Sequence, residues 1–223
     1  MTNPSIIAAA DTPPDVRPDA SRRAPPDASG LGLLLYGLQS PINIGMILRV
    51  AETYRFAVSI YDQFQVLDDP QRRGTIADFA CGAVARQGFE PLADEAAIVA
   101  ALHGRRLIAT SIAAGGDVLP DFDFRRGDVF ALGNEYDGLP DALLARADAV
   151  LHIPMPAGWA PKPKAERPID PARTAAVAND GQPNLNVAMT AGILCYAAYV
   201  SGLGKGNSTA APHGVAASAE AAR

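Results

Sequence analysis

The chain has 223 residues, of which 48% are hydrophobic and 19% are charged; this length and composition predict one globular domain with a sizeable core and exclude a wholly disordered chain. No apolar run approaches the ~20 residues that a membrane span needs, and the N-terminus shows no secretory signal, so we expect a cytoplasmic protein that does not cross a membrane. The formal net charge of −5 means that contact with a nucleic acid would depend on a local basic patch or on a partner subunit.

The chain divides into an ordered body and two tails. Residues 1–30 hold six prolines and few large apolar groups, and residues 203–223 are rich in Ala, Gly and Ser. Such segments cannot bury enough surface to offset the entropy that ordering costs. We therefore predict disordered tails over 1–30 and 203–223 and a folded domain over 31–202.

Short apolar runs alternate with helical patterns inside the body. Strands are expected over 31–38, 58–61, 106–110, 128–132 and 149–153, and helices over 44–54, 94–102, 140–145 and 187–200. Runs of this length suit buried strands, and alternation of strands with helices is typical of parallel sheets. The sequence therefore predicts an α/β fold with a mostly parallel sheet flanked by helices.

The few cysteines and histidines carry no sign of a metal site or a nucleophilic triad. The two cysteines, Cys81 and Cys195, cannot form a disulfide scaffold or a four-ligand site. We interpret both as buried thiols in a reducing cytosol. The three histidines are scattered along the chain, and we expect no metal.

The first polar motif runs from Ser40 to Arg49, where a strand gives way to a helix. Asn43 is a good N-cap residue, because its side-chain oxygen can accept a hydrogen bond from an early backbone N–H. Gly45 and Arg49 are four residues apart and share one helix face, so the small residue is expected to leave open space beside the guanidinium. That arrangement suits a ligand near the carboxyl end of a strand. The alternative is an ordinary capped helix with an exposed Arg.

The second motif follows the strand predicted over 128–132. Gly133 would let a ligand approach the backbone closely, Gly138 would permit a positive φ, and Glu135 lies between them. Pro140 suits the first turn of the next helix. The alternative is a strand-turn-helix joint with a solvated Glu.

The third motif is split by a long insertion. Ile153-Pro154-Met155 ends a strand, and Asn184 and Asn186 offer amide groups around a turn before the helix over 187–200. That helix is rich in Ala and Gly, so it can lie close to another backbone. The alternative is a pair of turn asparagines before a core helix.

The insertion, residues 156–183, carries six prolines, three lysines or arginines between 162 and 167, and the single Trp159. It is too long for an ordinary connection. Two interpretations remain open, namely a floppy insertion and a basic, aromatic-bearing flap over a site.

Taken together, the three motifs and their order resemble the SpoU (TrmH-like) branch of the SPOUT RNA methyltransferases over about residues 31–202. Cys81-Gly82-Ala83 resembles the small-residue turn that this family has after the second strand, and Asn184 stands where the family usually has Ser. The family's three motifs are matched in turn by Asn43 and Arg49, by Gly133, Glu135, Gly138 and Leu139, and by Ile153, Pro154, Met155, Leu185 and Asn186.

The resemblance implies an α/β-knot fold with a C-terminal trefoil knot and a homodimer with the site at its interface. It also implies methyl transfer from S-adenosyl-L-methionine to a ribose 2′-hydroxyl in tRNA or rRNA. Arg49 would be the catalytic residue, oriented by Asn43 and Glu135, with Asn186 anchoring the third turn. The cofactor would be held by Leu132, Gly133, Ile153, Met155, Asn184 and Leu185.

Two other functions stay open. One is a small-molecule or nucleotide-binding α/β protein without an RNA substrate, which the negative net charge favours. The other is a catalytically inactive cofactor-binding module, which the altered third motif favours.

Overall fold

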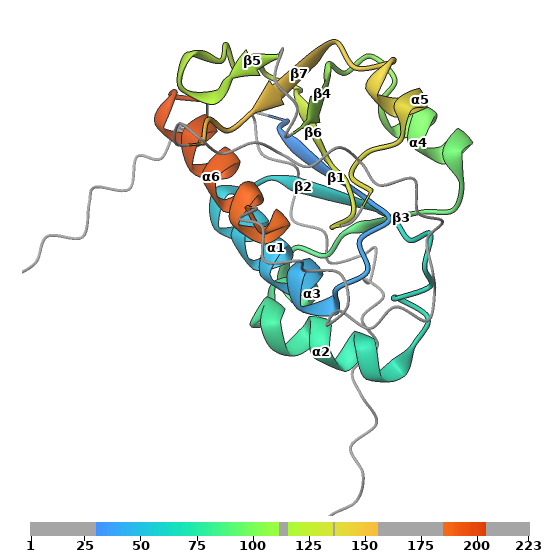
Figure 1. Cartoon of the computed structure of the whole chain (residues 1–223). Coiled ribbons are helices and arrows are strands. Elements are labelled where there is room, and N and C mark those ends of the chain that lie inside the picture. The colour runs from blue at the N-terminus through green and yellow to red at the C-terminus, as the bar shows by residue number, and fades with distance from the viewer. Residues whose placement is uncertain (1–29, 112–115, 136, 156–184, 204–223) are drawn as a thin grey trace, which may run out of the picture.

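A seven-stranded sheet, parallel throughout, forms the centre of the computed structural model, which describes residues 30–111, 116–135, 137–155 and 185–203 (Figure 1). The spatial order of the strands is β3-β2-β1-β6-β4-β7-β5. The prediction of an α/β fold with a parallel sheet is confirmed. The strands are β1 (Gly32–Tyr36), β2 (Ala57–Tyr61), β3 (Glu90–Leu92), β4 (Leu107–Thr110), β5 (Asp117–Val118), β6 (Val129–Leu132) and β7 (Ala149–His152).

Helices cover both faces of the sheet. One face carries α1 (Pro41–Tyr54) and α6 (Val187–Val200), with α2 (Pro70–Ala80) and α3 (Ala83–Arg86) packed on α1 (Figure 1). The other face carries α4 (Glu95–Ala101) and α5 (Asp141–Leu144). A short 3₁₀ turn, η2 (Leu119–Asp121), follows β5.

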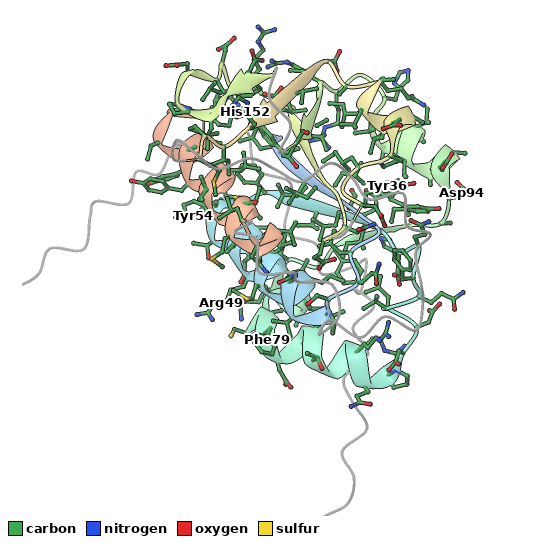
Figure 2. The ribbon with its side chains drawn as sticks, in the orientation of Figure 1. Tyr36, Arg49, Tyr54, Phe79, Asp94 and His152 are labelled. Atoms are coloured by element: carbon green, nitrogen blue, oxygen red, sulfur yellow. The ribbon has the colours of Figure 1, made fainter. Side chains whose placement is uncertain are left out.

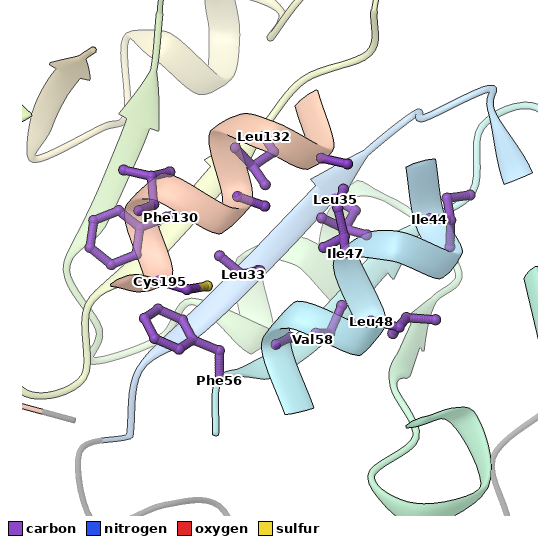
Figure 3. Packing of buried hydrophobic residues seen from close by; sticks show 14 of the residues in the cluster. Leu33, Leu35, Ile44, Ile47, Leu48, Phe56, Val58, Phe130, Leu132 and Cys195 are labelled. Carbon is purple, nitrogen blue, oxygen red and sulfur yellow. The ribbon is translucent and has the colours of Figure 1, made fainter. Parts of the chain in front are cut away.

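Alternate residues of the central strands pack into two separate hydrophobic cores, one on each face of the sheet. In β1, Leu33 and Leu35 belong to the larger core beneath α1 and α6, whereas Leu34 and Tyr36 belong to the smaller core beneath α4 and α5. Figure 3 shows the larger core, to which Phe130 of β6 and Cys195 of α6 both contribute. Side chains of a strand point alternately to the two faces, so a strand buried on both sides must be apolar at every position. This is why the central strands are continuous apolar runs in the sequence.

Helix α1 begins three residues earlier than predicted, and Asn43 is not its N-cap. The cap is Ser40, whose Oγ accepts a hydrogen bond from the Asn43 N–H at 3.3 Å. Pro41 follows at the first helical position, where its fixed φ suits a helix and its missing N–H costs nothing. The prediction was wrong because Ser-Pro caps the helix before Asn43 is reached. The Asn43 side chain is therefore available for other partners.

Helices α2 and α3 were not predicted, and this corrects the interpretation of Cys81. Only Ile76 and Ala80 of α2 are buried, so the segment has too little apolar periodicity to be recognised. Cys81 is the C-cap of α2, and with Gly82 it joins α2 to α3. The turn therefore lies between two helices and does not directly follow the second strand. Cys81 is exposed, whereas Cys195 is buried as expected.

Gly45 is required for close packing of α1 on α2. A Cβ built at Gly45 would lie 2.7 Å from the Ile76 carbonyl oxygen and 2.7 Å from the Phe79 Cβ. The space beside Arg49 on this face is therefore filled by α2, and the expectation of open space was wrong. A side chain at position 45 is excluded by a neighbouring backbone, not reserved for a ligand.

Several predicted features lie outside the described residues. These are the greater parts of the two tails, over 1–29 and 204–223, and the insertion over 156–183. The residues between β7 and α6 lie largely outside the described ranges, so the knot remains a prediction, as does the boundary of the domain at 31 and 202. Within the described ranges, no helix has the length and apolar character that crossing a membrane requires.

Asp128, just before β6, makes folding stability depend on pH. Its side chain is fully buried; Oδ2 accepts hydrogen bonds from the Arg125 N–H at 2.8 Å and from Arg106 Nη1 at 3.4 Å. Oδ1 has no hydrogen-bond partner within the described part of the chain. Burial raises the pKa of Asp128 above its ordinary 3.8, while the Arg125 N–H and the nearby guanidinium groups oppose that rise.

A raised pKa in the folded state means that ionised Asp128 costs stability. The cost is present above the raised pKa and is relieved as the pH falls through it towards the ordinary value of 3.8. We expect the difference in free energy of unfolding between the wild-type protein and Asp128→Asn to shift in favour of the wild type as urea titrations are moved stepwise from neutral pH down to about pH 4. A difference between the two proteins that stays constant with pH would contradict this assignment.

Candidate functional site

Side chains from all three sequence motifs meet in one polar network at the carboxyl edge of the sheet. Asn43 Nδ2, on α1, donates to Oε1 of Glu135, in the loop after β6, at 2.7 Å. Asn43 Oδ1 accepts from Nδ2 of Asn186, the residue before α6, at 3.1 Å. These partners lie 92 and 143 residues apart in the sequence. The fold has therefore brought three strand-end turns together, as the sequence predicted.

The backbone extends this network at both ends. The Gln39 N–H donates to Glu135 Oε2 at 3.2 Å, and the Ala188 N–H donates to Asn186 Oδ1 at 2.8 Å, which caps α6. Asn43 is only 7% exposed, so its amide needs these partners to offset the cost of leaving water. The two asparagines use both ends of their amides. The network thus fixes the β1–α1 turn, the loop after β6 and the start of α6 relative to one another.

The loop that presents Glu135 is closed by its own backbone. The Gly138 N–H donates to the Asn134 carbonyl at 3.1 Å, and Asn134 Oδ1 accepts from the Asp137 N–H at 2.8 Å. A Cβ at Gly133 would lie 2.1 Å from the Gly138 carbonyl carbon, and Gly138 has a φ of +69°. The close approach at Gly133 is therefore made by Gly138. This tight turn sets the direction in which Glu135 leaves the loop.

Arg49 lies apart from the network in the single chain. Six residues along a helix correspond to about 9 Å and about 240° of rotation, so Asn43 and Arg49 point to different sides of α1. The exposed Arg49 donates from Nη1 to the Cys81 Sγ at 3.3 Å. Figure 2 shows it on the outer side of α1, near Phe79 of α2. Within the described residues, no hydrogen bond joins Arg49 to Asn43 or Glu135, so they do not orient it directly in one chain.

The residues predicted to hold a cofactor follow the carboxyl ends of β6 and β7. Leu132 is buried in the larger core beside the turn at Gly133. Ile153, Met155 and Leu185 are half-buried, the first two after β7 and the third just before Asn186. Asn184 lies outside the described residues. An aromatic ring such as adenine binds well between half-buried apolar side chains. The turns beside them supply backbone N–H and C=O groups that can bind the polar edge of such a ring.

Sequence reasoning missed Gln39 and Cys81 as partners of the site residues. The Gln39 N–H could not have been found from residue type, because every residue except proline can supply a backbone donor. Cys81 did stand in a recognised Cys-Gly-Ala turn, but its contact with Arg49 depends on α2, which was not predicted.

Comparisons with known proteins point to the same family as the three motifs that meet at this site. The model of the SpoU rRNA Methylase family matches residues 30–160. A structure concerned with the 2-OH methylation of C/U34 on tRNA is 27% identical, with a TM-score of 0.57, covering 77% of this chain and 97% of that one.

Two longer proteins share the fold. An AdoMet-bound rRNA methyltransferase from Sinorhizobium meliloti is 22% identical, with a TM-score of 0.59 over 83% of this chain. The SpoU methyltransferase AviRb from Streptomyces viridochromogenes, in complex with AdoMet, is 21% identical, with a TM-score of 0.57 over 84% of this chain. The present chain spans 61% and 66% of their lengths. No protein with a curated description matches the sequence.

Proposed function

Because the chain belongs to the SpoU rRNA methylase family, we propose that it transfers a methyl group from S-adenosyl-L-methionine to a ribose 2′-hydroxyl of tRNA or rRNA. The observation that carries the proposal is the hydrogen-bonded meeting of Asn43, Glu135 and Asn186, one residue from each motif. The tRNA-related structure is matched over nearly its whole length, so tRNA is the first substrate to test. We place the reaction in the cytoplasm, where these RNAs are found.

The residues at the carboxyl edge of the sheet fit the methyl donor. Ile153, Met155 and Leu185 supply half-buried apolar surface for the adenine ring, and the turns after β6 and β7 supply backbone donors and acceptors. We assign Leu132, Gly133 and Asn184 to the same site. When bound, S-adenosyl-L-methionine supplies a methyl group already activated on sulfur. The protein must align an acceptor oxygen with that methyl and help the oxygen lose its proton.

Arg49 is our candidate for the catalytic residue. A guanidinium stays protonated in proteins and offers five N–H donors, so it acts as a donor and not as a base. Exposed on α1, Arg49 can orient the ribose hydroxyl and stabilise negative charge that develops on its oxygen. Asn43, Glu135 and Asn186 are positioning residues that hold the three turns in place.

A homodimer would complete the site, because Arg49 lies away from the polar network of its own chain. The outer face of α6 carries an exposed apolar stripe at intervals of four, three and four residues, formed by Met189, Ile193, Tyr196 and Val200. Tyr54 of α1 packs against Tyr196 and Tyr199, with ring centroids 6.5 and 5.7 Å apart, so the stripe continues onto α1. We assign this α6 stripe to a second copy of the chain, which would bring Arg49 of one protomer toward the network of the other.

Tyr196→Glu is expected to convert the dimer to a monomer and to reduce methyl transfer. The tyrosine is 56% exposed in the single chain, and a carboxylate buried at an apolar interface without a partner is strongly unfavourable. Sedimentation velocity at micromolar concentration measures the change. Val99→Glu is the matched control, because Val99 is 42% exposed on α4, on the opposite face of the sheet. A wild-type monomer, or a Tyr196→Glu dimer, would contradict the assignment.

The proposed activity is tested by mapping 2′-O-methyl groups in tRNA and rRNA from cells with and without this protein. One site or a small set of sites should lose methylation, and purified protein with tritiated S-adenosyl-L-methionine should restore it. Calorimetry separates the other functions. Binding of the methyl donor without transfer to any RNA would indicate an inactive module, and absence of binding would refute the proposal.

We also propose the C-terminal trefoil knot and the domain boundaries at 31 and 202, which the family resemblance supports.

A further inference from the structure

Cys81 holds a backbone conformation that its residue type disfavours. As the C-cap of α2 it has a φ of +49°, in the left-handed region, and Gly82 follows with a φ of +84°. Helices commonly end on such a residue, but it is usually Gly and sometimes Asn, because a Cβ is crowded there. A cysteine at this position costs backbone energy that a glycine would avoid. Arg55, the C-cap of α1, has the same left-handed conformation, so a role for Cys81 depends on the contacts of its side chain.

The Cys81 side chain bridges α2 and α1. Its thiol lies 3.6 Å from the Asp78 carbonyl, to which it can donate, and its sulfur accepts from Arg49 Nη1 at 3.3 Å. Sulfur is a weak acceptor, and both groups are exposed, so the contact competes with water. It is nevertheless the only hydrogen bond that the described residues provide to the Arg49 guanidinium.

The backbone of Cys81 is itself fixed to α1. Arg86 Nη2 donates to the Cys81 carbonyl at 3.1 Å and to Glu52 Oε2 at 2.6 Å, and Arg86 Nε donates to Glu52 Oε1 at 2.5 Å. Glu52 lies three residues after Arg49 on α1. The sulfur and the guanidinium are therefore parts of one frame, held by a bidentate pair whose geometry is specific.

We propose that Cys81 is a positioning residue for Arg49, an inference that rests on the proposed function of Arg49. A long exposed side chain samples many rotamers, and ordering it at the moment of reaction costs entropy. The Cys81 sulfur restricts that sampling in the free protein. It selects guanidinium orientations that leave the remaining N–H donors for the ribose.

The test compares Cys81→Gly, Cys81→Ser and the wild-type protein. Glycine removes the acceptor and relieves the positive φ, so Tm should stay the same or rise. At the same time kcat for RNA methylation should fall by about 3- to 10-fold, the range for a modest exposed hydrogen bond, with the Kd for S-adenosyl-L-methionine unchanged. Serine keeps an acceptor and should restore most of the activity. Cys195→Ala, which removes the buried thiol, is the control that should lower Tm and leave kcat unchanged.

A readout independent of activity is the NMR order parameter of the Arg49 Nε–H. It should fall in Cys81→Gly and recover in Cys81→Ser. The proposal is overturned if Cys81→Gly keeps both the wild-type kcat and the wild-type order parameter, or if its loss of activity follows a lower Tm. If the order parameter falls in Cys81→Gly but the wild-type protein methylates no RNA, the proposed function is wrong, while the ordering of Arg49 by Cys81 is still supported.

Discussion

Replacing Arg49 by Ala is expected to reduce kcat for methyl transfer by at least about 10²-fold, the usual effect of removing a donor that stabilises developing charge. Affinity for S-adenosyl-L-methionine should hardly change, because Arg49 lies outside the turns assigned to the methyl donor. Stability should also be nearly unchanged, since the side chain is exposed and makes one weak hydrogen bond. Single-turnover assays with the RNA substrate measure the first effect, and calorimetry measures the second.

Two further variants make that experiment decisive. Arg49→Lys keeps the charge but loses the planar donor set, so it should recover only part of the activity. Arg146→Ala removes an equal charge from an exposed position just after α5, on the opposite face of the sheet, and it controls for a general loss of RNA attraction. Turnover by Arg49→Ala equal to that of Arg146→Ala would remove Arg49 from the mechanism.

Gly133→Ala, unlike Arg49→Ala, should cause a large loss of affinity for S-adenosyl-L-methionine. The added methyl would lie 2.1 Å from the Gly138 carbonyl carbon and 2.4 Å from its oxygen, so the loop cannot stay closed. Overpacking of this kind costs about 1–3 kcal/mol of stability. The opened loop should also weaken binding of S-adenosyl-L-methionine by about tenfold or more, which corresponds to roughly 1.4 kcal/mol. Calorimetry and thermal unfolding measure the two effects.

Gly74→Ala is the matched control. Gly74 lies inside α2, and a Cβ there would have no neighbour within 4 Å. Alanine in a helix interior is favoured over glycine by up to about 1 kcal/mol, so Tm should rise and cofactor affinity should stay the same. If Gly133→Ala bound the cofactor as tightly as Gly74→Ala, the loop after β6 would have no part in the cofactor site.

Much of the architecture could be predicted because the sheet is buried on both faces. Its central strands β1, β6 and β4 are apolar at nearly every position, and the runs around Leu33, Ile108 and Phe130 are therefore visible without any structural information. Helix α6 was predicted with its observed bounds, because Asn186 gives a clear start and the Ala-rich run that follows contains no proline.

Other elements lack the apolar pattern by which a helix or strand is recognised in a sequence. Helix α2 buries only two side chains and packs through glycine, where Gly45 of α1 lets the Phe79 Cβ come close. Such a helix is held by backbone proximity and by its Asp69 cap, and it lacks an apolar stripe. Residue type could not reveal these contacts. Missing α2 led directly to the two errors about Cys81 and about the space beside Arg49.

For the candidate site, the motifs predicted that the three turns come together, but they did not predict which side chains form hydrogen bonds with one another. Parallel strands place their carboxyl ends at one edge, so turns after β1, β6 and β7 were expected to meet. That Asn43 faces Glu135 and not Arg49 follows from where α1 begins. Once Ser40 caps the helix, Asn43 falls within its first turn, and the angle to Arg49 is fixed by helix geometry.

The contrast between the two thiols gives the native sequence a single attachment point for spectroscopic probes. Burial raises the pKa of Cys195 to about 12, so it offers almost no thiolate to a maleimide, whereas Cys81 is exposed. A nitroxide attached to the unmutated protein therefore reports from the α2–α3 corner alone. In an assembly of two copies, the separation of the paired spin labels would give the relative placement of the protomers.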